Sequence, residues 1–319
     1  MPLLRLVPED THISFIEKRL FAFALSALII VGSLGLAFTK GVNFGIDFTG
    51  GTVIEIEVQK QPDLAELRGV LNDLDLGGVS IQEFGAPTDL MIRMPQQSGT
   101  AEERQAAIQK VRGALEQSFP DGVDYRRVEF VGPQVGEELK KAGLLSILFS
   151  LAGILVYIWF RFEWQFGVAA IIALAHDTIA TIGLFSVTQM EFTLATVAAI
   201  LMIAGYSIND TVVVFDRIRE NLRKYKKKPL PEIFDLSVNQ MLSRTLMTSL
   251  STLLALVALW FFGGEVIRGF VNALIFGIVI GTYSSIFVAA PSLVYLNVRN
   301  PQNDENQAEE DAQGQEQAG

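Results

Sequence analysis

Six long apolar blocks separate the more polar parts of this chain, and they constrain its fold more than any other feature. Each block is long enough to cross a bilayer as a helix, which takes about 20 residues. Half of the 319 residues are hydrophobic, a share that soluble proteins also reach, so the clustering carries the argument. The blocks are Leu20–Phe38, Ala142–Phe160, Gly167–Thr188, Phe192–Phe215, Ser243–Phe262 and Gly269–Leu296. The sequence therefore predicts a multi-pass α-helical membrane protein with six spans.

The first block is interpreted as a retained helix, because it is long for a signal peptide and no small-x-small cleavage pattern follows it. Orientation follows from the cations of the short loops. The segment between the fourth and fifth blocks contains Arg217, Arg219, Arg223, Lys224, Lys226, Lys227 and Lys228. We expect this segment and both termini to be cytoplasmic, with residues 39–141 on the opposite side of the membrane. The same cations could attract anionic membrane lipid, and we expect no nucleic-acid binding.

The large loop over residues 39–141 has the pattern of an independent α+β domain. Alternating or short apolar runs predict strands, and helical spacing predicts two helices between them. The strands are Thr52–Val58, Val79–Phe84, Leu90–Met94 and Tyr125–Val131, and the helices are Leu64–Leu71 and Ala101–Phe119. The order β-α-β-β-α-β predicts a ferredoxin-like domain, with a turn over Gly85–Asp89 between the middle strands.

Composition divides the rest of the chain and excludes several kinds of chemistry. We expect an N-terminal segment with the first span over 1–38, a bundle of five further spans over 142–299, and a disordered acidic tail over 300–319. The net charge is −10, and there are no cysteines. No disulfide, thiolate metal site or cysteine nucleophile can therefore form. We expect no enzymatic activity, no metal and no cofactor.

Asp210 is the first candidate functional residue, because it lies near the end of the fourth apolar block, in the motif Gly205–Thr211. A carboxylate in hydrocarbon costs roughly 2.5–3.5 kcal/mol on insertion scales. Such a group is retained where it pairs with another charge, faces the interior of a bundle or carries protons. Asp210 is therefore predicted to couple the protein to proton movement.

Two further ionisable residues lie at related depths. Asp210 is roughly 27 Å along the helix from the outer end of the fourth span, and Arg244 is roughly 27 Å from the outer end of the fifth. Asp177 lies roughly 16 Å from the outer end of the third span. We therefore predict a series of Asp177, Asp210 and Arg244 in which low dielectric favours a protonated carboxyl and a nearby guanidinium favours the charged form.

Structural interpretations remain open for each of these residues. Arg244 could extend to the cytoplasmic interface, as many arginines near helix ends do. Asp210 could lie among headgroups, and Asp177 could serve only as a local hydrogen-bonding group. A lone helical histidine such as His176 is more often structural than a proton relay.

Paired glycines follow the first span in Asp47-Phe48-Thr49-Gly50-Gly51. Glycines permit backbone conformations that other residues avoid. The segment is not a phosphate-binding P-loop, because no helix beginning with Lys-Ser/Thr follows it. We interpret the pair as a turn or hinge, with a ligand site as the alternative.

These motifs also resemble those of a known family. Asp47–Gly51, Gly205–Asn221 and Ser243–Leu250 are similar to segments of the SecD/SecF family of bacterial protein-export proteins, which is related to the RND transporters. The resemblance covers all of the chain except its acidic tail. Asp210 and Arg244 match the family's membrane acid and arginine linked to proton flow, and Asp47, Gly50, Gly51, Gly205 and Asn209 fall in its structural motifs.

The resemblance implies a function and a set of partners. It implies a SecD partner of the same six-span plan, a place beside the SecYEG channel, and use of the proton motive force in late translocation of a polypeptide. In the family, the larger periplasmic domain that handles the polypeptide belongs to SecD. Two alternatives remain: half of a proton/small-molecule antiporter, and a purely structural scaffold for a channel.

Overall fold

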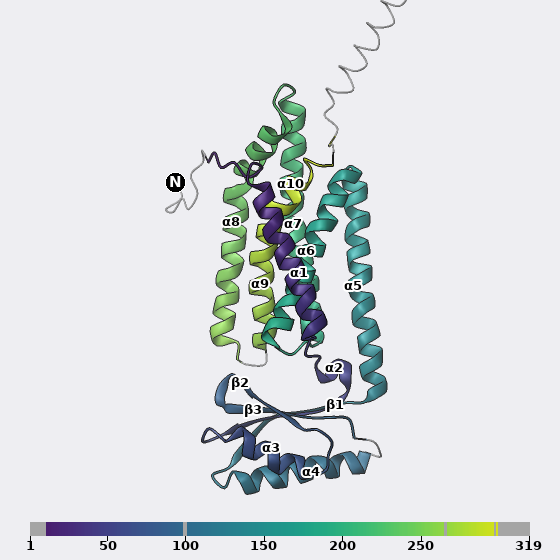
Figure 1. The fold of residues 1–319 in the computed structure, drawn as a ribbon, viewed down its shortest axis with the longest axis vertical. Coiled ribbons are helices and arrows are strands. Elements are labelled where there is room, and N and C mark those ends of the chain that lie inside the picture. The colour runs from purple at the N-terminus through teal and green to yellow at the C-terminus, as the bar shows by residue number, and fades with distance from the viewer. Residues whose placement is uncertain (1–10, 98–100, 265–266, 297, 299–319) are drawn as a thin grey trace, which may run out of the picture. The chain divides into compact units, whose positions relative to one another are not determined.

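The computed structural model describes residues 11–97, 101–264, 267–296 and 298. The chain divides into two compact units, and each is described by itself. One unit contains Met1–Val42, Ile147–Met190 and Ala198–Gly319, and the other contains Asn43–Ser146 and Glu191–Val197. Figure 1 labels the elements of both along the chain. The tail predicted to be disordered over 300–319 lies outside the described residues.

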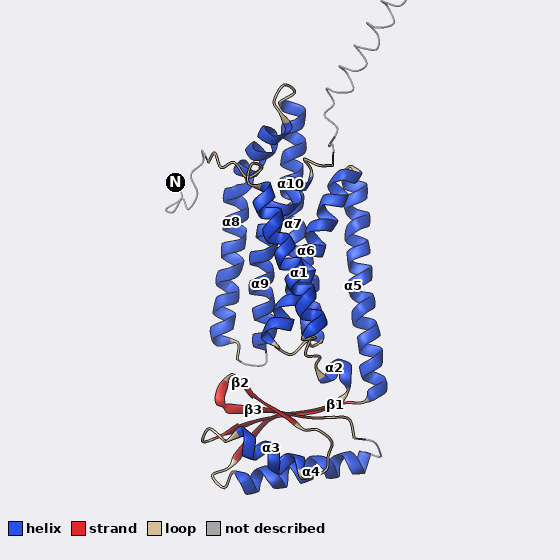
Figure 2. Ribbon diagram, in the orientation of Figure 1, coloured by secondary structure: helices blue, strands red, loops and turns tan. Residues whose placement is uncertain are grey.

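The smaller unit contains a four-stranded antiparallel sheet in the order β2-β3-β1-β4. Its elements are β1 (Gly51–Val58), α3 (Leu64–Asn72), β2 (Ser80–Phe84), β3 (Ala86–Met94), α4 (Ala101–Ser118) and β4 (Val123–Val131). Figure 2 shows α3 and α4 together on one face of the sheet. The predicted β-α-β-β-α-β order is confirmed, and this strand order is the ferredoxin-like one.

Alternation along β1 explains why both faces of the sheet are covered. Ile54 and Ile56 point to the face that carries α3 and α4, and they are buried there with Leu71. Val53 points to the opposite face, where it packs against Ile46 of the short helix α2 (Ile46–Thr49). The period of two therefore forms a main core on one side of the sheet and a smaller one on the other.

Two local features of this unit differ from the sequence expectation. β3 begins at Ala86 rather than at Leu90, so most of the turn predicted over Gly85–Asp89 is strand. Gly85 has a φ of +88°, and this left-handed conformation reverses the chain within very few residues. The helix α2 was not predicted, because a single turn is too short to show helical periodicity.

The six predicted spans are all present as long apolar helices. They are α1 (Arg19–Thr39), α5 (Pro133–Arg161), α6 (Trp164–Thr188), α7 (Leu194–Lys224), α8 (Leu230–Phe262) and α9 (Arg268–Ser284), which continues through a π-helical turn, η2 (Ser285–Ala289), into α10 (Ala290–Ser292). The π turn ends two residues before Pro291, which has no N–H to donate to an α-helical hydrogen bond.

Several spans extend well beyond the apolar blocks. α7 has 31 residues, or roughly 46 Å of helix, against about 30 Å of hydrocarbon. The basic segment expected to be a loop between the fourth and fifth spans is therefore helical as far as Lys224. Lys, Arg and Glu are good helix formers, so the helix continues where the apolar pattern stops.

The helices of the larger unit differ in how much of their surface is covered. In the most apolar stretch of α6 and of α9, more than half of the residues are buried, and in α7 half of them are. In α1, α5 and α8, less than a fifth of the residues in this stretch are buried. Large side chains such as Phe21 on α1, Phe149 on α5 and Leu254 on α8 are exposed. This exposure suits contact with lipid chains, whereas α6, α7 and α9 form the more buried part of the unit.

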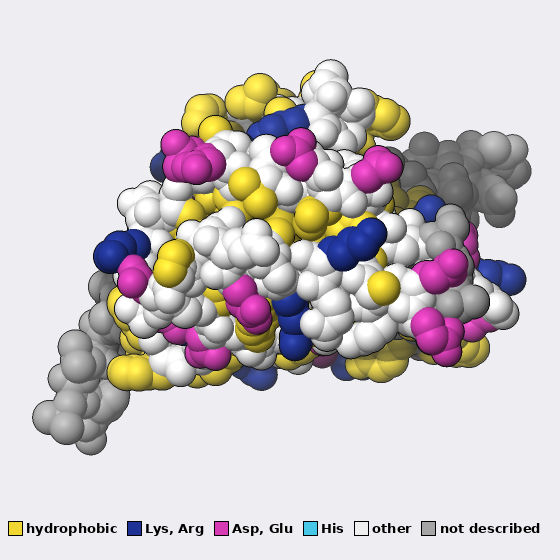
Figure 3. Space-filling model, turned by 90° about the horizontal axis from the view of Figure 1, so that it is seen from below, with side chains coloured by type: hydrophobic (Ala, Val, Ile, Leu, Met, Phe, Trp, Pro, Cys, Tyr) yellow, Lys and Arg dark blue, Asp and Glu magenta, His cyan; other side chains and the backbone are white. Residues whose placement is uncertain are grey.

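The sheet unit shows a different surface. Figure 3 views the molecule from the side of α3 and α4, and acidic and basic side chains alternate there with neutral ones. One ion pair at the surface of this unit joins Lys60 to Asp121 at 2.7 Å. Surface charge of mixed sign suits a water-exposed domain.

Gly51 provides a test of the turn interpretation. It has a φ of +117°, and a Cβ built there would lie 2.5 Å from the backbone oxygen of Met94. We predict that Gly51→Ala destabilises the sheet domain by at least about 1–3 kcal/mol, the usual cost of such backbone strain. Gly113→Ala on α4 is the matched control, because its added methyl group meets nothing within 4 Å. Protection of the β1 amides from hydrogen exchange in the full-length protein measures both, and equal protection in the two variants would contradict the prediction.

Candidate functional site

Asp210 on α7 is buried with its carboxylate only half satisfied. The Thr245 hydroxyl of α8 donates a hydrogen bond to Asp210 Oδ1 at 2.9 Å. Asp210 Oδ2 is buried and has no hydrogen-bond partner within the described part of the chain. A buried polar atom without a partner costs about 1–3 kcal/mol, and more when it is charged. Oδ2 is therefore the atom of this carboxylate at which a proton can be held.

Arg244 lies at the level of Asp210 but does not form an ion pair with it. Arg244 directly precedes Thr245, whose side chain contacts Asp210, so the predicted match in depth is present. The guanidinium interacts electrostatically with Asp210. Among the residues that the structure describes, however, no carboxylate lies within 4.0 Å of Arg244. Its side chain is exposed on the surface of this chain.

Asp177 on α6 has a contrasting environment in which both carboxylate oxygens are bonded. Ser207 Oγ donates to Asp177 Oδ2 at 2.6 Å, and Ser284 Oγ donates to the same oxygen at 2.8 Å. His176 Nδ1 lies 3.0 Å from Asp177 Oδ1. The group therefore ties together three helices, α6, α7 and α9.

A ladder of hydroxyl groups continues this network along α7. Ser207, which contacts Asp177, precedes Asp210 by about one turn of α7. Thr211 Oγ1 and Ser285 Oγ are 2.8 Å apart, and Ser285 Oγ donates to the Ser207 carbonyl at 3.4 Å. Ser285 begins the π turn η2, and such turns are frequent at functional sites. The structure thus places Asp177 and Asp210 in one polar region and Arg244 at its exposed edge.

Glycine allows α9 to approach this region closely. A Cβ added at Gly281 would lie 3.1 Å from Ser207 Cβ and 3.6 Å from Asp177 Oδ2. At Gly277, an added Cβ would collide with Ile203 of α7. The Gly-x-x-x-Gly spacing on α9 therefore sets the distance between the helices that hold Asp177.

Sequence reasoning missed the hydroxyl groups that position the acids. Ser207, Thr245 and Ser284 stand out in the sequence only as small polar residues within apolar blocks. These three residues lie at about the same depth in the membrane as the two aspartates, and this match could have identified them as partners. His176 was noted, and its Nε2 is buried without a hydrogen-bond partner in the described residues.

Two motif residues of α7 lie away from the acids. Gly205 and Asn209 are exposed, one turn apart on the same face. A Cβ added at Gly205 would meet nothing within 4 Å. An exposed amide such as Asn209 is costly within hydrocarbon. Asn209 of α7 and Arg244 of α8 are therefore exposed polar groups that would be costly in contact with lipid chains.

Asp47 and the paired glycines act within the smaller unit. Asp47 Oδ2 accepts the N–H of Leu194, the first residue of α7, at 2.8 Å. This bond satisfies one of the free N–H groups at the start of the helix, as an N-cap does. Gly50 and Gly51 both have positive φ values and join α2 to β1.

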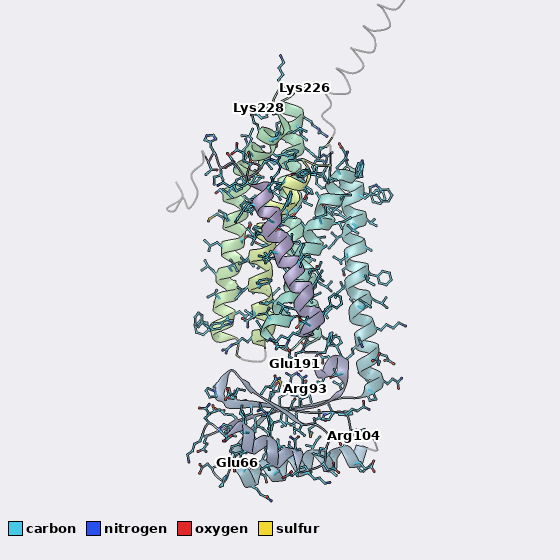
Figure 4. The ribbon with its side chains drawn as sticks, viewed as in Figure 1. Glu66, Arg93, Arg104, Glu191, Lys226 and Lys228 are labelled. Carbon is cyan, nitrogen blue, oxygen red and sulfur yellow. The ribbon has the colours of Figure 1, made fainter. Side chains whose placement is uncertain are left out.

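An ion pair fixes the segment that precedes α7 to the same unit. Arg93 of β3 bonds Glu191 at 2.6 Å, and Figure 4 shows the two labelled side chains pointing toward each other. Burial raises the pKa of the Glu191 carboxyl above its usual value, the Arg93 guanidinium lowers it, and Asp47 raises it further. Phe192 also pairs with Asn43 and Gly45 through backbone hydrogen bonds. The start of α7 is thus attached to the sheet domain.

Comparison with known proteins gives matches over nearly the whole chain. Residues 110–299 match the family model described as protein export membrane protein SecD/SecF, C-terminal, and residues 35–62 match the SecD/SecF GG motif. The protein translocase subunit SecF of Rickettsia rickettsii is 48% identical over 291 residues, which are 91% of this chain and 94% of that protein. The corresponding subunit of Rickettsia akari is 47% identical over 301 residues, covering 94% and 97%.

Solved structures agree with these matches. The crystal structure of SecDF from Thermus thermophilus, described as a translocon-associated membrane protein, has a TM-score of 0.82 and 38% identity. The match covers 92% of this chain and 40% of that chain. SecDF in a super-membrane-facing form has a TM-score of 0.66 and 35% identity. This chain therefore spans about two fifths of the solved chains that it resembles.

The bond from Asp47 to the start of α7 can be tested by hydrogen exchange. We predict that Asp47→Ala speeds exchange of the Leu194 amide by roughly fivefold, because losing a cap costs about 1 kcal/mol. Asp63→Ala removes a comparable cap, whose Oδ1 accepts from Ala65 N at 2.8 Å at the start of α3, and serves as the matched control. It should speed exchange only in α3. Unchanged exchange at Leu194 in the Asp47 variant would contradict the assignment.

The raised pKa of Glu191 predicts a pH dependence of stability. Between the ordinary glutamate pKa and its higher value in the folded domain, the folded state binds more protons than the unfolded chain. The free energy of unfolding should therefore rise as pH falls through this window. We predict a flatter profile for Glu191→Gln, measured by amide protection in β1 after correction for intrinsic exchange. Burial also raises the pKa of Glu55, so adding Glu55→Gln should flatten the profile further. An unaltered profile in both variants would show that these groups do not set it.

Proposed function

The chain belongs to the SecD/SecF family of protein-export membrane proteins, and from this premise we propose that it uses proton movement at Asp210 to assist export. The family and the export role follow from the similarity to translocase subunits over most of the chain. The comparisons favour export over small-molecule antiport. The buried Oδ2 of Asp210, which no donor satisfies in the described residues, is the observation on which the proton-coupled step rests.

The proposed chemistry needs only one proton. In the charged state, the Asp210 carboxylate accepts the Thr245 hydroxyl at Oδ1 and attracts the Arg244 guanidinium. A proton that binds Oδ2 converts the carboxylate to a neutral carboxyl group and removes that attraction. The Thr245 bond can persist in both states, because a hydroxyl group can donate to a carboxyl oxygen as well. The change in charge therefore acts mainly on Arg244.

Asp177 is proposed as a second acid on the proton path. Two hydroxyl groups, those of Ser207 and Ser284, donate to its Oδ2 and fix the position of the carboxyl group. Ser207 joins it to the turn of α7 that precedes Asp210. A hydroxyl group can accept one proton while it donates another, so Ser207 is a suitable link between the two acids.

Movement at Asp210 can reach the sheet domain through α7 itself. The helix is continuous from Leu194 to Lys224. Its first residue is bonded to Asp47, and the segment before it is fixed by Glu191 and Arg93. We propose that α7 transmits the proton-dependent shift, in addition to α1 and α5, which join the same domain through the chain.

The exposed polar face indicates where a partner belongs. Gly205 and Asn209 of α7 and Arg244 of α8 are exposed, and a lone arginine in hydrocarbon is costly. The solved SecDF chains are more than twice as long as the matched part. We propose that a SecD subunit covers this face, and that the pair works beside a SecYEG channel on a translocating polypeptide.

We further propose the arrangement in the membrane that the cations indicate. The protein lies in the inner membrane, with both termini and the α7–α8 connection in the cytoplasm and residues 39–141 in the periplasm. The unequal distribution of Lys and Arg between the two sides supports this orientation.

Replacing Asp210 tests the proton step. We predict that Asp210→Asn abolishes the gradient-dependent part of preprotein export, because an amide cannot gain or lose a proton near neutral pH. Export into inverted vesicles that contain the complete translocation machinery, with and without a proton gradient, measures this part. Asp235→Asn on α8 is the matched control: it lies outside the site, and its acceptor for the Ile16 N–H is kept.

The outcome separates the alternatives for this site. A gradient response equal to the unmodified protein in Asp210→Asn would refute proton coupling through this residue. Full activity in Asp210→Leu as well would favour a structural scaffold. Loss in the Asp235 variant to the same extent would indicate a general defect in folding.

A further inference from the structure

A charged cavity lies between the ends of α5 and α7, away from the two aspartates. It has a volume of about 460 Å³, and it is lined by Arg161, Asp216, Arg219, Glu220, Arg223 and Lys224. This size falls within the usual range for ligand sites. Nothing in the proposed proton step uses these residues.

Both carboxylates of the cavity form ion pairs, whereas three of its cations form none in the described part of the chain. Arg161 Nη2 bonds Asp216 at 2.9 Å. Glu220 bonds Arg217, which lies outside the cavity lining, at 2.5 Å. Within the described residues, no carboxylate lies within 4.0 Å of Arg219, Arg223 or Lys224; the bonded pairs are those just named. The cavity therefore carries an excess of positive charge.

Two of the guanidinium groups are held in place by an aromatic ring. Phe162 is buried, and the guanidinium carbons of Arg161 and Arg219 lie 5.0 and 5.3 Å from its ring centroid. Arg219 Nη1 also donates to the Arg161 carbonyl at 3.2 Å. Cations ordered in this way lose little freedom when an anion binds.

The surroundings indicate that the cavity lies at the surface of the bilayer. Trp159, Phe160 and Trp164 flank Arg161 in sequence and are 71%, 86% and 59% exposed. Exposed aromatic side chains at the end of a span are typical of the headgroup level of a membrane. The position therefore suits a ligand that combines an anionic group with an apolar part.

We propose that this cavity binds the phosphate group of an anionic phospholipid. Basic pockets between spanning helices bind such headgroups in other membrane proteins. Arg219 and Arg223 offer planar donors for phosphate oxygens, and Lys224 adds a point charge. The lipid chains then lie along the exposed aromatic residues of α5. This site goes beyond the proposed function and does not depend on Asp210.

The site can be tested with the two tryptophans beside it. The full-length protein with Trp260→Phe retains Trp159 and Trp164 as reporters. It is reconstituted in phosphatidylcholine vesicles that contain a small equal fraction of either brominated phosphatidylglycerol or brominated phosphatidylcholine. Bromine quenches a nearby tryptophan, so selective binding gives stronger quenching by the anionic lipid.

Charge-matched variants separate the cavity from general attraction to the basic segment. The cavity variant replaces Arg219, Arg223 and Lys224 with Gln, and the control variant replaces Lys226, Lys227 and Lys228 with Gln. Figure 4 shows Lys226 and Lys228 at the tip of the α7–α8 connection, and neither they nor Lys227 line the cavity. Each variant removes three charges, and the control should keep the preference for the anionic lipid.

We expect the cavity variant to reduce the preference for phosphatidylglycerol by at least about tenfold, since each charge-assisted hydrogen bond to the phosphate contributes roughly fivefold or more and the control lysines make no such bond. The exposed single variant Arg223→Gln should reduce it about fivefold, which guards against misfolding of the triple variant. Asp210→Asn should leave it unchanged, so this result is independent of proton coupling.

Three outcomes would overturn the proposal. Equal quenching by both lipids in the unmodified protein would show that no selective site exists. Equal losses in the cavity and control variants would indicate diffuse attraction to the basic segment. If millimolar inorganic phosphate released the lipid, and if phosphate bound with the same affinity to the protein in detergent, the cavity would be a site for a soluble anion.

Discussion

The cost of placing a carboxylate in hydrocarbon is the constraint on which the bundle depends. Among the described residues, Asp177 and Asp210 are buried between its helices, and they meet this cost in different ways. Asp177 receives two hydroxyl donors and a histidine nitrogen, so its charge is compensated in place. Asp210 receives one donor, and its second oxygen is left for a proton. In the proposed mechanism, the same residue type therefore anchors three helices on α6 and binds the proton on α7, because the number of donors around it differs.

Close helix packing makes this difference possible. Gly277 and Gly281 bring α9 against α7, and the hydroxyl of Ser284 then reaches Asp177 from the other side. Pro291 cannot donate an α-helical hydrogen bond, and a π turn precedes it. This turn begins at Ser285, whose hydroxyl contacts that of Thr211. The polar contacts of α7 thus rely on glycine and proline positions in a helix that carries no charge near the site.

Much of the fold could be predicted from the sequence, whereas the partners of the site residues could not. Apolar length is enough to locate a span, and alternation is enough to locate β1 and its neighbours. Depth along a helix placed Arg244 level with Asp210, but it carries no information about rotation around the axis, so it could not decide whether Arg244 faces Asp210 or the surface. Asp47 bonds a backbone N–H far away in the chain. Such a contact leaves no periodic pattern, because it depends on how the elements fold together.

The helix α7 carries the proton-binding residue of the proposed mechanism between two points of attachment. An α-helix with intact hydrogen bonds is stiff, so a shift imposed at one turn moves its other turns as well. Roughly 24 Å of helix separates Leu194 from Asp210, and roughly 20 Å separates Asp210 from Arg223. In the proposed cycle, the change of charge occurs between these two attachments, one to the sheet domain and one to the lipid headgroup. An attachment at the headgroup level would resist sliding of the helix along its axis, so a shift that starts at Asp210 would be expressed mainly at Leu194. The two proposals are independent in their tests, yet together they would direct the motion of α7 toward the sheet domain.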